Sequence, residues 1–286
     1  STVEQEVNVK SQTYLEQSFR VVRWRQEPGF GEMEFPETSV FRALENNRLG
    51  LVLVMAPSGH GKSRFAEAME AKLCGAMPIL RLDVAHEFAQ TLATARDDAV
   101  PLQLIRQLKI PEGEQQQEFR QLMAKARWIL VVENLHEVSE VQRPWVITAL
   151  HAFVARYHRR AQVVVMTRPD VRLTNDAQMP FDTILETWPL DCTRVDVLAQ
   201  IQLGAASGKF RPWLAAQGID QPNTGDKRCT YRHLQTFRAV EAATAAAKAM
   251  GLDKGDGQSA LRGPRSVAVE QFALGLLRPD LTKERL

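Results

Sequence analysis

The residues best suited to chemistry lie together in residues 56–63, which read Ala-Pro-Ser-Gly-His-Gly-Lys-Ser. A glycine-rich loop that ends in Gly-Lys-Ser can enclose phosphate groups, because its backbone N–H groups converge on phosphate oxygens. Lys62 would reach the outer phosphates, and the Ser63 hydroxyl would hold Mg²⁺. We therefore expect a site for Mg²⁺ with ATP or ADP. Its expected contacts are Pro57, Ser58, Gly59, His60, Gly61, Lys62, Ser63 and Arg64.

The elements on both sides of this loop have the order that such a site needs. Residues 51–55 form an apolar run that predicts a buried strand, and residues 64–70 predict a helix whose positive end faces the loop. The usual first glycine is replaced by Ala56, whose small side chain still permits close backbone approach. A chance glycine-rich turn is the alternative, and the strand and helix on either side argue against it.

A second chemical group follows the apolar residues 128–132, where Glu133 ends a predicted central strand. A carboxylate at this place would support Mg²⁺, so the expected metal set is Ser63 and Glu133. The next residue is Asn134, whose amide cannot accept a proton from attacking water. Glu137 could substitute as the base. We expect tight nucleotide binding with slow hydrolysis; the alternative is that Glu133 only caps a strand end.

A cation ends another predicted strand, residues 162–168, where Arg168 follows Thr167. An arginine there could sense the γ-phosphate or stabilise charge that develops on it, although a surface arginine that closes a strand would look the same. The expected catalytic residues are therefore Glu133, Arg168 and Glu137.

The remaining pattern predicts how these residues are positioned. Further strands are expected at residues 78–84 and 181–186, with helices between the strands, for example at 142–157. This alternation predicts an α/β fold with a parallel five-stranded P-loop NTPase sheet flanked by helices. Beyond Pro189 only helices are predicted, for example over residues 231–250, where the Ala-rich residues 239–250 have strong helix propensity. We expect an N-terminal arm (1–35), an NTPase core (36–189) and a small all-helical lid domain (190–286).

Composition excludes several classes of protein. The chain has 286 residues, of which 44% are hydrophobic and 24% charged, as in ordinary globular proteins. No apolar run approaches the ~20 residues that cross a bilayer, so no membrane partner is expected. Three widely spaced cysteines suggest neither a disulfide framework nor a metal site, which favours the cytoplasm. A net charge of +2 does not indicate nucleic acid, although the basic pair Lys227-Arg228 leaves such a contact open.

Taken in order, these motifs resemble the nucleotide-binding module of the STAND NTPases, the signal-transduction ATPases that include NB-ARC and NACHT proteins and are related to AAA+ ATPases. The resemblance rests on residues 57–66, 129–138 and 163–169, and it spans roughly residues 36–277. In this family a Gly-x-Pro motif approaches the adenine. Here the related residues read Gly263-Pro264-Arg265, so Pro264 and Arg265 are implied nucleotide contacts.

The resemblance implies a regulatory or defence switch in a larger protein. ADP would hold a closed monomer, and a trigger with ATP would open it for oligomerisation. The implied partners are further copies of the chain or further domains, together with a trigger ligand or protein. The main alternative is an AAA+-type ATPase that acts on DNA or protein, such as a transposition or loading ATPase. A P-loop kinase of small molecules and a degenerate scaffold are the others.

Overall fold

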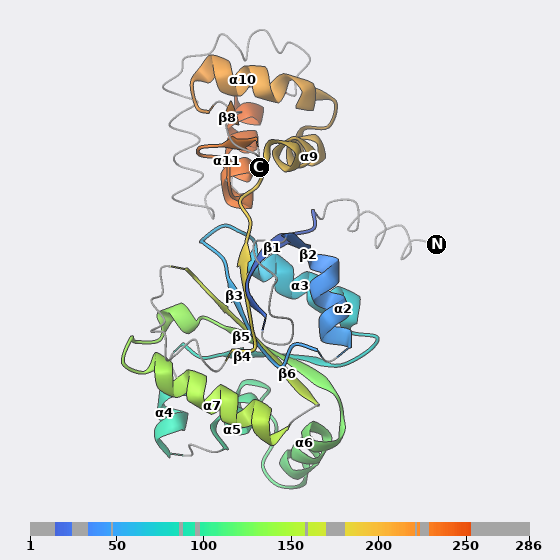
Figure 1. The fold of residues 1–286 in the computed structure, drawn as a ribbon, viewed down its shortest axis with the longest axis vertical. Helices are drawn as coiled ribbons and strands as arrows, with labels where there is room; N and C mark the ends of the chain where they lie inside the picture. The colour runs from blue at the N-terminus through green and yellow to red at the C-terminus, as the bar shows by residue number, and fades with distance from the viewer. Residues whose placement is uncertain are drawn as a thin grey trace. The chain divides into compact units, whose positions relative to one another are not determined.

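The computed structural model describes residues 15–24, 34–46, 48–85, 88–94, 98–157, 160–169, 181–220, 222–223 and 229–252. Contacts divide the chain into two compact units (Figure 1). One unit, called the core unit below, comprises Gln17–Ser58 and Lys62–Trp188. The other, called the helical unit, comprises Ser1–Glu16, Gly59–Gly61 and Pro189–Leu286.

The core unit is built on one sheet whose strand order is β2-β1-β7-β3-β6-β5-β4. Five strands are parallel to one another: β3 (Leu51–Met55), β4 (Ile79–Asp83), β5 (Trp128–Glu133), β6 (Ala161–Thr167) and β7 (Thr183–Thr187). The predicted α/β class and parallel sheet are therefore confirmed. The strand β3 is central and buried on both faces, which explains its unbroken apolar sequence.

Two further strands extend the five parallel strands at one edge, and they include residues of the expected N-terminal arm. The strand β1 (Ser18–Trp24) pairs antiparallel with β7, and β2 (Glu34–Pro36) pairs antiparallel with β1. Arg20 of β1 forms an ion pair with Glu186 of β7 and lies over the ring of Trp188. Residues 18–24 are thus part of the core sheet. The alternation of the buried Phe19 and Val21 with the charged Arg20 between them was the available signal.

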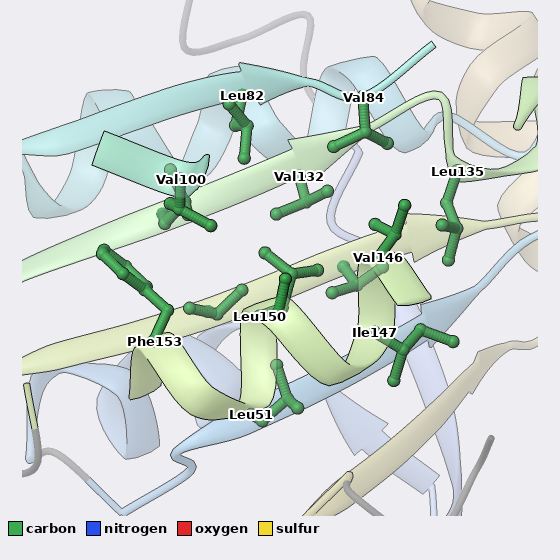
Figure 2. Close-up of a cluster of buried hydrophobic side chains, with 14 of the residues drawn as sticks. Leu51, Leu82, Val84, Val100, Val132, Leu135, Val146, Ile147, Leu150 and Phe153 are labelled. Atoms are coloured by element: carbon green, nitrogen blue, oxygen red, sulfur yellow. The ribbon is translucent and has the colours of Figure 1, made fainter. Parts of the chain in front are cut away.

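Helices cover both faces of the sheet. Among its described residues, the core unit has the helices α2 (Glu37–Glu45), α3 (Lys62–Leu73), α4 (Phe88–Thr94), α5 (Ala99–Gln107), α6 (Glu114–Lys125), the 3₁₀ turn η2 (Leu135–Glu137) and α7 (Arg143–Arg156). Figure 2 shows α7 packed on one face, where Leu150 and Phe153 meet strand residues such as Leu51. On the other face Phe65 of α3 contacts Phe19 and Phe41, with ring centroids 5.0 and 5.4 Å away.

The helical unit has its own core. Its elements are α9 (Cys192–Leu203), the 3₁₀ turn η3 (Gly204–Lys209), α10 (Phe210–Gln217), α11 (Phe237–Ala249) and two short antiparallel strands, β8 (Pro222–Asn223) and β9 (Thr230–Tyr231). The helical part was predicted, but the hairpin was not. The expected helix over residues 231–250 begins later, at Phe237, because Tyr231 pairs with Pro222 and the Thr236 side chain caps α11.

A disulfide joins Cys192 at the start of α9 to Cys229 beside β9. This contradicts the expectation that the cysteines form no disulfide. The disulfide could not be inferred from the spacing of the cysteines, since 37 positions separate the two residues. The fold brings them together because Asp191 bridges Thr230 and the Cys192 N–H donates to the Cys229 carbonyl oxygen. The argument from cysteine usage for a reducing compartment therefore no longer holds.

The helices are short in both units. The longest among the described residues is α7, with 14 residues. Within the described ranges, none combines the length and the apolar character that a membrane crossing requires.

Candidate functional site

The candidate site lies where the parallel strands of the core unit end. The loop after β3 leads directly into α3, which begins at Lys62. Gly59 and Gly61 have φ values of 80° and 81°, a conformation that glycine adopts without steric cost. The Ala56 side chain is completely buried, and its N–H donates to the Thr167 carbonyl oxygen at 3.0 Å. The alanine at the first motif position is therefore accommodated as part of the core.

Lys62 turns back onto its own loop. Its Nζ donates to the carbonyl oxygens of Ala56 at 2.6 Å and Pro57 at 3.2 Å. The ammonium group is thus held by the residues that enclose the expected phosphates. Ser63 follows in the first turn of α3, where the helix dipole favours an anion. The loop therefore holds the Lys62 ammonium group against its own backbone at the start of α3.

Two carboxylates meet on the neighbouring strands. Glu133 ends β5 and pairs in register with Asp83, which ends β4. Asn134 follows in a left-handed conformation with a φ of 64°, and its Nδ2 donates to Asp83 Oδ2 at 3.0 Å. The amide is therefore fixed as a donor to Asp83. Sequence reasoning missed Asp83, although it ends a predicted strand at the same edge as Glu133.

The surroundings of Glu133 make its carboxylate less acidic than usual. Burial is the main cause that raises its pKa, and the negative charges of Asp83, Glu70 and Glu67 act in the same direction. The guanidinium of Arg81 opposes them, with its Nη1 3.6 Å from Glu133 Oε1. Arg81 was also missed from the sequence. The available signal was a charged residue within a predicted apolar strand.

Thr167 and Arg168 lie between these carboxylates and the loop. Thr167 ends β6, pairs in register with Met55, and is completely buried. Its Oγ1 has no hydrogen-bond partner among the described residues, and neither has the buried Nε of Arg168. Two polar groups without partners at this edge of the sheet fit a polar ligand, because such groups are otherwise costly to bury.

Three other predicted site residues are Glu137, Pro264 and Arg265, and the structure describes only Glu137, which it connects less directly to the candidate site. Glu137 lies on the turn η2, with its side chain 46% exposed and its Oε1 3.9 Å from His136 Nε2. Its main-chain N–H donates to the Asn134 carbonyl oxygen at 2.9 Å, which keeps it within one turn of Asn134. Pro264 and Arg265 lie outside the described residues.

The donor set of the core unit fits Mg²⁺ with a nucleotide. A hydroxyl from Ser63 and a carboxylate from Glu133 are oxygen ligands of the kind that Mg²⁺ prefers. Lys62 and the start of α3 supply positive charge for phosphates. Among the described residues, no group of three or more histidine, cysteine or acidic side chains forms a metal site by itself.

No protein-family model and no curated protein matches the sequence. Solved structures with a similar fold include a RuvB variant from Thermotoga maritima, with 14% identity over 83% of this chain and 66% of that chain, and a TM-score of 0.44. The HORMA:CdnC:Trip13 complex of E. coli MS115-1 has 16% identity, covers 78% of this chain and 74% of that chain, and scores 0.47.

The Drosophila ORC bound to DNA has 13% identity, covers 82% of this chain and scores 0.47. The present chain spans 58% of that protein's chain and 66% of the RuvB chain. With TM-scores below 0.5, these similarities assign neither a family nor a function.

Proposed function

We propose that this chain is an ATP- or ADP-binding regulatory NTPase module, a STAND-like switch that hydrolyses ATP slowly and couples its nucleotide state to oligomerisation or signalling. The observation that carries the proposal is the arrangement around Glu133. Glu133 ends β5, and the amide of the next residue, Asn134, donates to the carboxylate of Asp83.

Each residue of the loop has a role in this proposal. Residues 57–64 bind the phosphates through backbone N–H groups, and Lys62 exchanges its two carbonyl acceptors for phosphate oxygens. Ser63 and Glu133 hold Mg²⁺, which when bound offsets the charge of the phosphates. Arg168 senses the γ-phosphate from the end of β6. Pro264 and Arg265 remain predicted contacts of the nucleotide.

The proposal of slow hydrolysis rests on Asn134, the amide that directly follows the metal ligand Glu133 in the sequence. A general base must reach the attacking water and accept its proton, which a neutral amide does not do. Asn134 therefore supports a protein that retains nucleotide. Glu137 stays the predicted substitute for the base, from its position one turn beyond Asn134.

One observation favours the alternative, an AAA+-type ATPase that acts on DNA or protein. Asp83 stands beside Glu133, so this edge has two carboxylates where the sequence motif indicated one. One could support Mg²⁺ while the other accepts a proton, and the raised pKa of Glu133 would suit a base. Turnover above roughly 1 s⁻¹, within the ordinary range of enzymes, would support this alternative.

The proposal is tested by size-exclusion chromatography of the full-length protein with ADP and with a non-hydrolysable ATP analogue, after nucleotide binding has been measured. A switch predicts a small species with ADP and a larger one with the analogue. An identical elution volume with both nucleotides bound would refute the switch. The turnover measured on the same sample separates the two candidates.

A further inference from the structure

Arg81 lies between two carboxylates of the core unit. It is a residue of β4, two positions before Asp83, and it points to the same side of the sheet because strand side chains alternate. Its Nε donates to Glu70 Oε1 at 2.6 Å, and its Nη2 donates to Glu70 Oε2 at 3.1 Å. The remaining Nη1 lies 3.6 Å from Glu133 Oε1. One guanidinium therefore joins α3 to the acidic end of β5.

The charges around Arg81 are otherwise negative. Glu67 and Glu70 lie on α3 at positions i+4 and i+7 from Ser63, so the three residues share one helix face. The negative charges of Asp83, Glu67 and Glu70 all raise the pKa of Glu133. The positive charge of Arg81 lowers it. Its positive charge lies at the carboxylate on which a bound Mg²⁺ would depend.

The two contacts of Arg81 differ in strength. The contact with Glu70 has two parallel hydrogen bonds, the arrangement in which arginine binds a carboxylate best. The contact with Glu133 is an ion pair at 3.6 Å, which is longer than a hydrogen bond. Glu70 therefore anchors the guanidinium and keeps it from binding Glu133 fully. If Glu70 were absent, the same guanidinium could form its hydrogen bonds with Glu133.

We propose that Arg81 is a positioning residue that competes with Mg²⁺ for Glu133, and that Glu70 sets the strength of this competition. The inference rests on the proposed function, because it concerns the Mg²⁺ of that same nucleotide site. It makes the affinity for Mg²⁺ adjustable through a residue that touches neither the metal nor the nucleotide. Loss of Arg81 strengthens Mg²⁺-dependent binding, and loss of the Glu70 anchor weakens it.

The test uses the full chain and a fluorescent ADP analogue. Its dissociation constant is measured in EDTA and in Mg²⁺. The constant in EDTA divided by the constant in Mg²⁺ is called the Mg²⁺ coupling. We expect Arg81→Gln to raise this coupling about threefold, the value of a partly exposed ion pair. We expect Glu70→Gln to lower it by more than Glu67→Gln does. Glu67 lies on the same helix face as Glu70. Glu67→Gln is therefore the matched control, since it removes the same charge and leaves the hydrogen bonds between Glu70 and Arg81 intact.

Two further variants separate positioning from a merely structural role. In the Arg81→Gln background, Glu70→Gln should lower the coupling no more than Glu67→Gln does, because no guanidinium is released. Glu133→Gln should remove the Mg²⁺ coupling, and Arg81→Gln should then have no further effect on it. The temperature of thermal unfolding should fall by a similar amount for Arg81→Gln and Glu70→Gln, since each breaks the same ion pair. Their Mg²⁺ couplings should change in opposite directions.

The outcomes are distinct. If Arg81→Gln leaves the coupling unchanged or lowers it while the wild-type protein binds ADP with Mg²⁺, the inference is wrong and the proposed function stands. Equal effects of Glu70→Gln and Glu67→Gln would also overturn it. If the wild-type protein binds no nucleotide, the proposed function fails and the inference fails with it.

Discussion

The two units of the chain achieve order by different means. In the core unit, helices α2, α5, α6 and α7 have no side-chain cap, and a seven-stranded sheet with large aliphatic side chains holds them. In the helical unit, Asp191 caps α9 and Thr236 caps α11. That unit also carries the disulfide, and α11 buries mainly alanines, which offer little apolar area each. Helix caps and a covalent crosslink therefore matter more in the helical unit, and packing matters more in the core unit.

The largest expected difference comes from the disulfide. Reduction, or the double change Cys192→Ala with Cys229→Ala, should lower the free energy of unfolding of the helical unit by about 3–4 kcal/mol, because 37 positions separate the cysteines. The core unit should be unaffected. Calorimetry with and without reductant measures both transitions, and Cys74→Ala is the control, since Cys74 is free and exposed. Equal shifts of both transitions would contradict the comparison.

The second prediction concerns chemistry in the core unit. Lys62→Ala should weaken ADP binding about 100-fold, because a charged donor to phosphate is lost. Fluorescence titration measures this change. Lys72→Ala is the matched control: Lys72 lies on the same helix, over the ring of Phe41, and should leave binding within about twofold. If both variants bind alike, Lys62 is not a phosphate ligand.

A smaller effect is expected from the helix caps. Thr236→Ala removes the acceptor of the Ala239 N–H, which it binds at 3.0 Å, and should cost the helical unit about 1 kcal/mol. Chemical denaturation followed through the helical signal measures this loss. Thr236→Ser keeps the oxygen and should restore most of the stability. An alanine variant as stable as the wild type would argue that packing, not capping, orders α11.

The smallest effect is a pH dependence. Only the ionised carboxylate of Glu133 supports Mg²⁺, and burial raises the pKa of Glu133 above its ordinary 4.5. The Mg²⁺ coupling should therefore decline as the pH falls through this raised pKa, at a higher pH than for an ordinary glutamate. A titration in EDTA over the same range corrects for protonation of the phosphates. Arg81→Gln should move the decline to a still higher pH, and Glu133→Gln should abolish it.

The sequence predicted the parts of the molecule that depend on local pattern. The apolar strands, the loop that ends in Lys62 and Ser63, and the strand that ends in Glu133 each lie within a few consecutive residues. Pairings between distant segments were not predictable in the same way. The bond between Asn134 and Asp83 needs two strands in register, and the disulfide needs the hairpin β8–β9. Arg81 looked like an isolated charge until α3 brought Glu70 to it.

The pairing of β1 with β7 has a consequence for the order in which the chain can fold. Arg20 and Glu186 are 166 positions apart, yet they are paired in register. Of the strands described, β1 is synthesised first, but its neighbour β7 is synthesised after the other four strands of the parallel sheet. During vectorial synthesis β1 cannot pair with β7 until β7 has been made. This pairing joins residues that are far apart in the sequence and therefore has a high contact order. We infer that docking of β1 is a late step in the folding of the core.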